Sequence, residues 1–263
     1  MARSAIINVM VQTAMKAGRS LARDFGEVQN LQVSLKGPGD YVSQADRKAE
    51  EIIHAELSKV RPGYSFLMEE RGAVEGDDDQ HRWIVDPLDG TTNFLHGIPI
   101  FSISIALERQ GQIVAGVVYN PAMDELYTAE RGGGAFMNDR RLRVAARKHL
   151  SDAVVSTGVP HLGRGHHGRA LLELKNVMGE TAGIRRFGSA ALDLAYVAAG
   201  RVDGYWENWL APWDVAAGIL LVREAGGFCT DHKGGQDMFD EGSIVAGNEP
   251  IHRALLKTIQ KTA

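Results

Sequence analysis

Residues 83–93 read WIVDPLDGTTN, an apolar run followed by a turn that carries two carboxylates. The apolar residues predict a buried strand, and we expect it to end at Asp86 because Pro87 has no N–H group to donate to a neighbouring strand. Residues 89–93 are typical of the start of a short helix. At such a strand-to-helix turn, Asp86 and Asp89 can face one point in space.

This turn offers the groups that phosphate-ester hydrolysis needs. Carboxylate oxygens such as those of Asp86 and Asp89 are the ligands that Mg²⁺ prefers. Gly90 allows the backbone to approach a ligand closely, and the N–H groups of a first helical turn can bind an anion. Asp-Pro and Asp-Gly are also ordinary turn sequences, but the full run through Asn93 is more specific than a turn.

Helices and strands are expected on both sides of this turn. Apolar residues recur at helical spacing over 7–25 and 45–57, which predicts two amphipathic helices. Gly26 is the expected end of the first helix, and Ser43 is the expected N-cap of the second. Residues 64–144 are rich in β-branched and aromatic residues and predict strands.

The second half of the chain contains both the helical spacing and the strand spacing of apolar residues. Strands are expected at 154–157, 202–206 and 244–246, and helices near 168–178, 189–199, 215–224 and from Pro250 onward. The pattern predicts a layered α and β protein. No linker separates the halves, so we expect one domain over 1–263 with subregions 1–147 and 148–263.

Composition limits the class of protein. The 263 residues have a formal net charge of −4, which excludes a global attraction for polyanions. The one cysteine, Cys229, excludes an intramolecular disulfide, and we expect it to be a packed core thiol in a protein of the reducing cytoplasm. We expect no signal peptide and no membrane-spanning helix, because polar residues interrupt every apolar stretch.

Two further stretches, read together with residues 83–94, resemble the inositol monophosphatase family. Residues 212–218, PWDVAAG, look like the family's second signature, and residues 188–204 look like its bacterial SuhB-type branch. The resemblance covers nearly the whole chain. It implies a five-layer αβαβα sandwich (fold class α+β), a homodimer, inhibition by Li⁺, and Mg²⁺-dependent hydrolysis of inositol monophosphate with two or three ions per site.

The resemblance also implies roles for individual residues. The implied metal ligands are Glu69, Asp86, the Leu88 carbonyl, Asp89 and Asp214. Thr91 and Asp46 would activate the attacking water, and Glu69 would share in this catalytic role. The implied substrate contacts are Asp89, Gly90, Thr91, Gly188, Ser189, Ala190, Glu207 and Asp214. Lys36 and Asp40 would belong to a mobile lid.

Simpler roles remain open for several of these residues. Asp46 lies three residues after Ser43 and can complete a capping box. Glu69 and Glu70 can be solvated charges at the end of a strand. Asp214 can favour a helix dipole whether or not it binds a metal. Arg71 departs from the family pattern, and a guanidinium there can pair with Glu70 or reach the phosphate.

Other substrates of the same superfamily are open alternatives: fructose-1,6-bisphosphate, histidinol phosphate and phosphoadenosine phosphate. A second phosphate would require more cations near the pocket, and the available candidates are Arg185, Arg186 and Arg201. The basic stretch over 140–149 suggests a role in binding RNA or the transcription machinery. The stretch has no interleaved aromatic residues, so nucleic acid is not expected as the main partner.

Two groups of residues have side chains that can bind a metal, but the sequence around them does not favour a metal site. His161, His166 and His167 lie in a glycine-rich stretch without cysteine, and we expect a surface loop near a helix start rather than a zinc site. Residues 75–79 are acidic but lack the spacing of a calcium-binding loop, so we expect a solvated turn.

Overall fold

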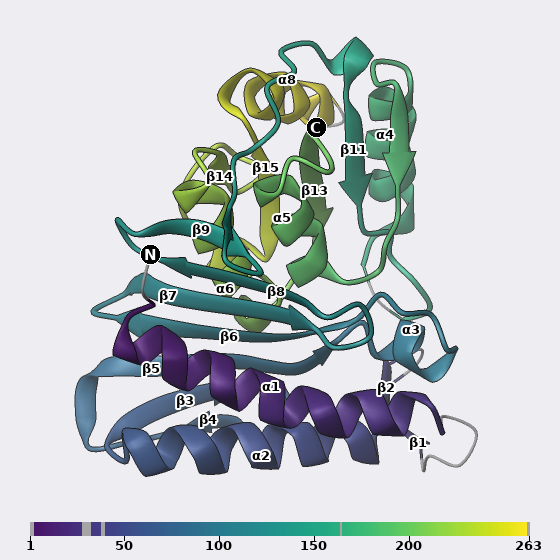
Figure 1. The fold of residues 1–263 in the computed structure, drawn as a ribbon. Coiled ribbons are helices and arrows are strands. Elements are labelled where there is room, and N and C mark those ends of the chain that lie inside the picture. The colour runs from purple at the N-terminus through teal and green to yellow at the C-terminus, as the bar shows by residue number, and fades with distance from the viewer. Residues whose placement is uncertain (1–2, 28–32, 38–39, 164, 262–263) are drawn as a thin grey trace.

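A computed structural model describes residues 3–27, 33–37, 40–163 and 165–261 of the chain, with side chains left undescribed at 33–37 and 40–43. Helices and sheets alternate in five layers, from α1 and α2 at the bottom of Figure 1 to α4 and α8 at the top. This is the αβαβα sandwich that the family resemblance implies, so the expected α+β fold class is confirmed.

The first helical layer packs on one face of the larger sheet. It contains α1 (Ala5–Phe25) and α2 (Gln44–Val60), whose apolar stripes bury Met10 and Ile53 completely. The Ser4 hydroxyl caps α1 by accepting a hydrogen bond from the backbone of Ile7. The first helix ends at Gly26, as predicted. A short hairpin of β1 (Val33–Gly37) and β2 (Asp40–Ser43) precedes α2.

Within the described residues, the larger sheet has eight strands in the order β10-β9-β8-β7-β6-β5-β3-β4. Their bounds are β3 Tyr64–Met68, β4 Gly72–Val74, β5 Asp78–Asp89, β6 Ser102–Arg109, β7 Gln112–Asn120, β8 Glu125–Glu130, β9 Gly134–Met137 and β10 Arg140–Arg141. Side chains alternate along β5. Trp83 and Val85 face α1 and α2, whereas Ile84 faces the next helical layer.

The predicted end of β5 at Asp86 is wrong, because the strand continues through Pro87 to Asp89. Asp86 pairs with Ser104 of β6, and Asp89 pairs with Ser102 across a shift in register. Pro87 therefore lies in a bulge, where the missing N–H leaves no ladder hydrogen bond unmade. The bulge turns the end of β5 out of the regular sheet and toward α3 (Thr91–Leu95).

The central helical layer lies between the two sheets and contains α5 (Ala190–Ala198) and α6 (Pro212–Glu224). Glycines allow α6 to pack closely against the larger sheet and against α5. A Cβ atom on Gly116 of β7 would lie 3.1 Å from the Cα of Ala217, and one on Gly218 would lie 2.5 Å from a methyl group of Leu194. The core around this layer takes residues from both halves of the chain, from Ile84 to Ala246.

Within the described residues, the smaller sheet has five strands in the order β12-β11-β13-β15-β14, covered on its outer side by α4 and α8. The bounds of this region are β11 Val154–Thr157, α4 His167–Met178, β12 Gly183–Arg185, β13 Gly204–Asn208, β14 Phe228–Thr230, α7 Met238–Glu241, β15 Ser243–Gly247 and α8 Glu249–Gln260. The strand predicted at 202–206 therefore begins and ends two residues later. Cys229 is buried in β14, as predicted.

In the part of the chain that the structure describes, every helix is too short or too polar to cross a lipid bilayer.

Candidate active site

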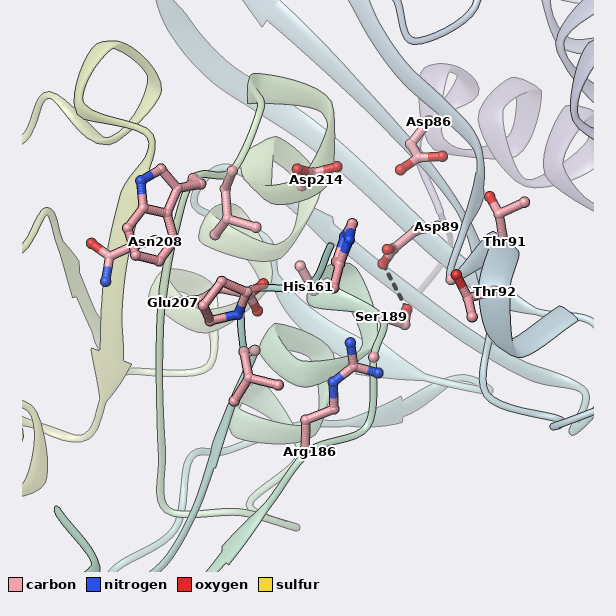
Figure 2. A pocket seen from close by; sticks show the side chains of 18 of the residues that line it. Asp86, Asp89, Thr91, Thr92, His161, Arg186, Ser189, Glu207, Asn208 and Asp214 are labelled. Carbon is pink, nitrogen blue, oxygen red and sulfur yellow. Dashed lines mark hydrogen bonds between the residues drawn. The ribbon is translucent and has the colours of Figure 1, made fainter. Parts of the chain in front are cut away.

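One cavity lies where the end of β5 meets the first turns of α3, α5 and α6. The remaining walls come from the end of β13 and from residues 158–161, which follow β11 (Figure 2). The lining residues are Glu69, Asp86, Leu88, Asp89, Gly90, Thr91, Thr92, Gly158, Val159, Pro160, His161, Arg186, Gly188, Ser189, Ala190, Glu207, Asn208, Trp209, Leu210 and Asp214.

The turn after β5 is fixed by its own backbone. The Asp86 carboxylate is buried and accepts a hydrogen bond from the Leu88 N–H at 2.9 Å. Gly90 has a φ of 94°, and a Cβ atom there would lie 3.0 Å from the Ile100 carbonyl oxygen. A side chain at Gly90 would therefore be strained twice, by its backbone conformation and by this contact.

Asp89 and Asn93 join this turn to the second half of the chain. Oδ2 of Asp89 accepts hydrogen bonds from the Ser189 hydroxyl at 2.6 Å and from the Ala191 N–H at 2.7 Å (Figure 2). The Asn93 side-chain amide donates to the carbonyl oxygens of Ile100 and Phe187, each at 2.7 Å. The first turn of α5 is thus placed against the β5 turn by charged and polar contacts.

Thr91 and Asp46 form the pair that the resemblance implies. Oγ1 of Thr91 lies 3.1 Å from Oδ1 of Asp46 and 3.0 Å from the Leu88 carbonyl oxygen. Asp46 is fully buried in the first turn of α2, behind the cavity wall rather than on it. A hydroxyl has a single proton to donate, so Thr91 can bond one of these acceptors while its oxygen accepts from a ligand in the cavity.

Glu207 and Asp214 face the cavity from the second half of the chain (Figure 2). The Tyr205 hydroxyl donates to Oε2 of Glu207 at 2.6 Å. Oδ2 of Asp214 accepts from the backbone N–H of Ala211 at 2.7 Å, so the predicted role at the helix start is present together with a place in the cavity. Gly158 leaves room for Glu207, because a Cβ atom there would lie 1.9 Å from that carboxylate.

Burial and neighbouring carboxylates raise the pKa of Asp86 and of Asp89. Burial raises the pKa of Asp86 well above its usual range, and the charges of Glu69, Asp89 and Asp214 raise it further. Burial also raises the pKa of Asp89 to about 7, although its hydrogen bonds from Ser189 and Ala191 oppose the shift. This concentration of negative charge favours a bound cation.

The donor set suits Mg²⁺, because hard oxygen ligands from carboxylates and a carbonyl are what that ion prefers. In their present positions, no three His, Cys, Asp or Glu side chains of the described residues form a set that can hold a metal ion. The fold therefore gathers the carboxylates into one cavity without closing them around one point, and their roles as ligands stay predictions.

Comparison with known proteins identifies the family. A family model described as the inositol monophosphatase family matches residues 2–263. An inositol-1-monophosphatase of Mesorhizobium japonicum is 79% identical over 99% of this chain and 98% of its own length. The Nus factor SuhB of Pseudomonas aeruginosa is 44% identical over 97% of this chain and 96% of its own length. The crystal structure of the extragenic suppressor protein suhB of Bartonella henselae is similar with a TM-score of 0.96 and 69% identity, covering 98% of this chain and 99% of that one.

The chain belongs to the inositol monophosphatase family. The resemblance first seen in residues 83–94 and 212–218 is thereby confirmed, and the protein is a phosphatase.

The cavity contains most of the residues that the family resemblance implies. Glu69, Asp86, Leu88, Asp89, Gly90, Thr91, Gly188, Ser189, Ala190, Glu207 and Asp214 all line it. Lys36 and Asp40 lie in the β1–β2 hairpin, and their side chains lie outside the described part of the structure, so the lid stays a prediction.

Several cavity residues were missed by the sequence analysis. They are Thr92, Gly158, Val159, Pro160, His161, Asn208, Trp209 and Leu210, whereas Arg186 was named only as a candidate cation for a second phosphate. His161 lies in a loop, as expected, and this loop also reaches the cavity wall (Figure 2). The only available signal was the position of residues 158–161 directly after a predicted strand, because binding residues often lie on loops at strand ends.

The remaining candidates lie elsewhere. His166 caps the exposed start of α4, as predicted for this loop, by accepting from the Arg169 N–H at 3.0 Å. Arg71 pairs with Glu50 at 3.3 Å and lies 3.9 Å from Glu51, two partners that the sequence analysis did not name.

We predict that Asp89→Asn stabilises the metal-free protein at alkaline pH. A carboxyl whose pKa is about 7 in the folded state and near 3.8 when unfolded holds a proton that the unfolded chain has released. Folded stability therefore falls as pH rises through this window, and an uncharged amide removes the cost. We expect the melting temperature in EDTA to rise by about 2–6 °C at pH 8 and the difference to shrink toward pH 4.

Asp79→Asn is the matched control, because Asp79 is exposed and far from this cluster in the β5 region. Its melting temperature should follow that of the natural protein at both pH values. An Asp89→Asn variant that melts at or below the natural protein at pH 8 would contradict the electrostatic account.

Proposed function

We propose that the protein hydrolyses the phosphate ester of a cyclitol or sugar monophosphate with Mg²⁺, and that inositol monophosphate is its substrate. The observation that carries the proposal is the cluster of carboxylates around the buried Asp86, beside the hydrogen-bonded pair of Thr91 and Asp46. The printed name of the Mesorhizobium japonicum relative, inositol-1-monophosphatase, supports the same substrate.

Glu69, Asp86, Asp89, Asp214 and the Leu88 carbonyl would hold two or three magnesium ions. Bound magnesium supplies positive charge to the phosphate oxygens and acidifies a water molecule. The carboxylates of the chain orient these ions and are in turn held by backbone N–H groups, as Asp86 is by Leu88 and Asp214 is by Ala211.

Thr91 and Asp46 would orient the attacking water and take up its proton. The Thr91 hydroxyl accepts a hydrogen bond from the water while donating its own proton toward Oδ1 of Asp46, 3.1 Å away. The buried position of Asp46 keeps this acceptor out of contact with bulk water. The water would attack phosphorus directly, while the bond from phosphorus to the ester oxygen breaks and the alcohol leaves. No cysteine takes part, because Cys229 is buried in β14, away from the cavity.

The second half of the chain would bind the leaving alcohol. Glu207 can accept hydrogen bonds from substrate hydroxyls, and residues 188–190 lie beside it in the cavity. Of the three arginines considered for a second phosphate, Arg186 lines the cavity. Arg201 instead forms two hydrogen bonds with Glu125, at 2.6 and 2.7 Å. This arrangement favours a substrate with one phosphate.

We further propose that the protein is cytoplasmic, forms a homodimer, is inhibited by Li⁺ and folds as a single domain over residues 1–263. The shared core of the two halves supports the single domain. The exposed leucines Leu171 and Leu172 on α4, 65% and 51% exposed, support burial against a second copy.

We predict that Asp86→Asn abolishes Mg²⁺-dependent hydrolysis of inositol 1-phosphate while the protein stays folded. Loss of a direct metal ligand should cost more than the roughly 100-fold that changes to outer-shell partners cost. Phosphate release is measured at saturating Mg²⁺, with circular dichroism as the folding check. Asp139→Asn, at an exposed carboxylate paired with Arg3, is the control and should keep full activity. Turnover by Asp86→Asn near the natural rate would refute the mechanism.

A turnover panel tests the substrate. We expect kcat/KM for inositol 1-phosphate to exceed that for fructose-1,6-bisphosphate, histidinol phosphate and phosphoadenosine phosphate by about tenfold or more. For the two bisphosphates the reason is that Arg186 is the one arginine that the described residues place on the cavity wall, whereas a second phosphate would need several cations there. Histidinol phosphate has one phosphate, but it lacks the ring hydroxyl groups that Glu207 would contact. Preference for a bisphosphate would overturn the substrate and leave the metal-dependent chemistry in place.

A second candidate function is RNA or transcription-complex binding. Relatives at 44% identity bear the name Nus factor SuhB. Arg140, Arg141 and Arg143 are exposed at or beside the edge strand β10 of the larger sheet. These residues offer a small basic surface, but the chain as a whole is acidic.

We expect RNA binding to be weak, with a Kd above about 1 μM at physiological salt, which is the range of non-specific binding. Gel shifts with a structured RNA measure it, and Arg140/Arg141/Arg143→Ala should weaken it further without affecting phosphate release. Tight binding that survives 200 mM salt and depends on these arginines would make RNA a main partner.

A further inference from the structure

Trp209 adopts a backbone conformation that its side chain disfavours. Its φ is 63°, in the left-handed region that glycine, asparagine and aspartate populate. Strained residues of this kind persist only where the surrounding structure holds them, and they gather at ligand sites. Trp209 lies on the wall of the cavity described above.

The backbone is held on both sides of Trp209. Asn208 is the last residue of β13 and pairs with Ser243 of β15. On the other side, the Leu210 N–H donates to the Gly242 carbonyl oxygen at 2.9 Å. Trp209 cannot move to a relaxed conformation without loss of one of these contacts, so its strain is imposed by the end of the smaller sheet.

The indole is held as well. A Cβ atom on Gly165 would lie 2.7 Å from Cε3 of Trp209 and 2.8 Å from Cβ of Pro160. Gly165 thus lies directly against both rings, and only glycine leaves space for them. Because Pro160 and Trp209 both line the cavity and both lie against Gly165, the loop after β11 and the end of β13 bring two rings together on its wall.

A polar group lies on the same side of the cavity. Glu207 precedes Trp209 by two residues, and its carboxylate is oriented by the Tyr205 hydroxyl. A cyclic polyol presents hydroxyl groups at its rim and C–H groups on its faces. A carboxylate beside an aromatic wall matches both, in the way that ligand pockets combine apolar walls with a few placed polar groups.

We propose that Trp209 determines the specificity of this phosphatase for its alcohol. Its indole is the apolar wall of the leaving-alcohol pocket, and it admits compact ring polyols while it excludes larger alcohols. The inference rests on the proposed function, because it assigns a role in binding the alcohol of a phosphomonoester.

Three substitutions of Trp209 test the proposal. Trp209→Gly and Trp209→Asn both suit the positive φ and both remove the indole, whereas Trp209→Phe keeps an aromatic wall. The substrates are inositol 1-phosphate, the larger adenosine 2′-monophosphate and the small glycerol 2-phosphate. Steady-state kinetics with Mg²⁺ and melting temperatures are measured for each protein.

We expect Trp209→Gly and Trp209→Asn to shift the kcat/KM ratio of adenosine 2′-monophosphate to inositol 1-phosphate upward by about tenfold or more. The loss for inositol 1-phosphate should appear mainly in KM, because the wall binds the alcohol and does not touch the phosphate. Trp209→Phe should stay near the natural ratio, and both small variants should remain folded at the assay temperature, because relief of the positive φ offsets part of the lost packing.

Two results would overturn the proposal. One is an unchanged substrate ratio in both small variants. The other is a change in Trp209→Gly alone, since backbone freedom rather than the indole would then explain it. Failure of the natural protein to hydrolyse inositol 1-phosphate would refute the proposed substrate instead, and the ratio of adenosine 2′-monophosphate to glycerol 2-phosphate across the variants would still test the wall.

Discussion

The carboxylate of Asp89 accepts two hydrogen bonds from the first turn of α5, at 2.6 and 2.7 Å, across a separation of about 100 residues. These bonds place the end of β5, in the larger sheet, against the start of α5, which lies between the two sheets. Charge-assisted bonds of this kind are short and directional, so the relative position of the two parts is set within a narrow range. That position brings Glu207 and Asp214 of the second half of the chain to the same cavity as Asp86 and Thr91.

The same carboxylates make the site electrostatically unfavourable without a cation. Asp86 and Asp89 both have raised pKa values because protein surrounds them and further carboxylates face them. Well-packed apolar layers on either side of the larger sheet offset this cost. Active sites commonly hold strained or repelling groups that the rest of the fold stabilises, and the charge that weakens this site would attract the proposed metal ions.

Chemistry and selectivity come from different parts of the chain. The β5 turn, α2 and α3 supply most of the groups proposed to act on the phosphate, among them Thr91 and Asp46, and α6 adds Asp214. The loop after β11 and the end of β13 supply the walls where the alcohol would lie, including Glu207 and Trp209. Changes in the second region can therefore alter the alcohol without altering the phosphate chemistry.

The sequence by itself determined the local features. The run from Trp83 to Asn93 predicted a strand, a turn and a short helix, and helical periodicity predicted α1 and α2 to within a few residues. These follow from contacts between residues close in the chain. The strand end at Asp86 was wrong because the bulge at Pro87 depends on the register with β6, which is a partner outside the run.

Only the tertiary structure decided which distant residues share the cavity wall. Arg186, His161 and Trp209 belong to no motif, and each reaches the cavity because a loop or strand end happens to be placed there by packing. The positive φ of Trp209 is set by hydrogen bonds of its neighbours to β15 and Gly242. Such long-range constraints leave no periodic or local signal in the chain, so the place of Trp209 on the cavity wall was visible only in the folded protein, whereas Glu207 and residues 188–190 were predicted from the sequence.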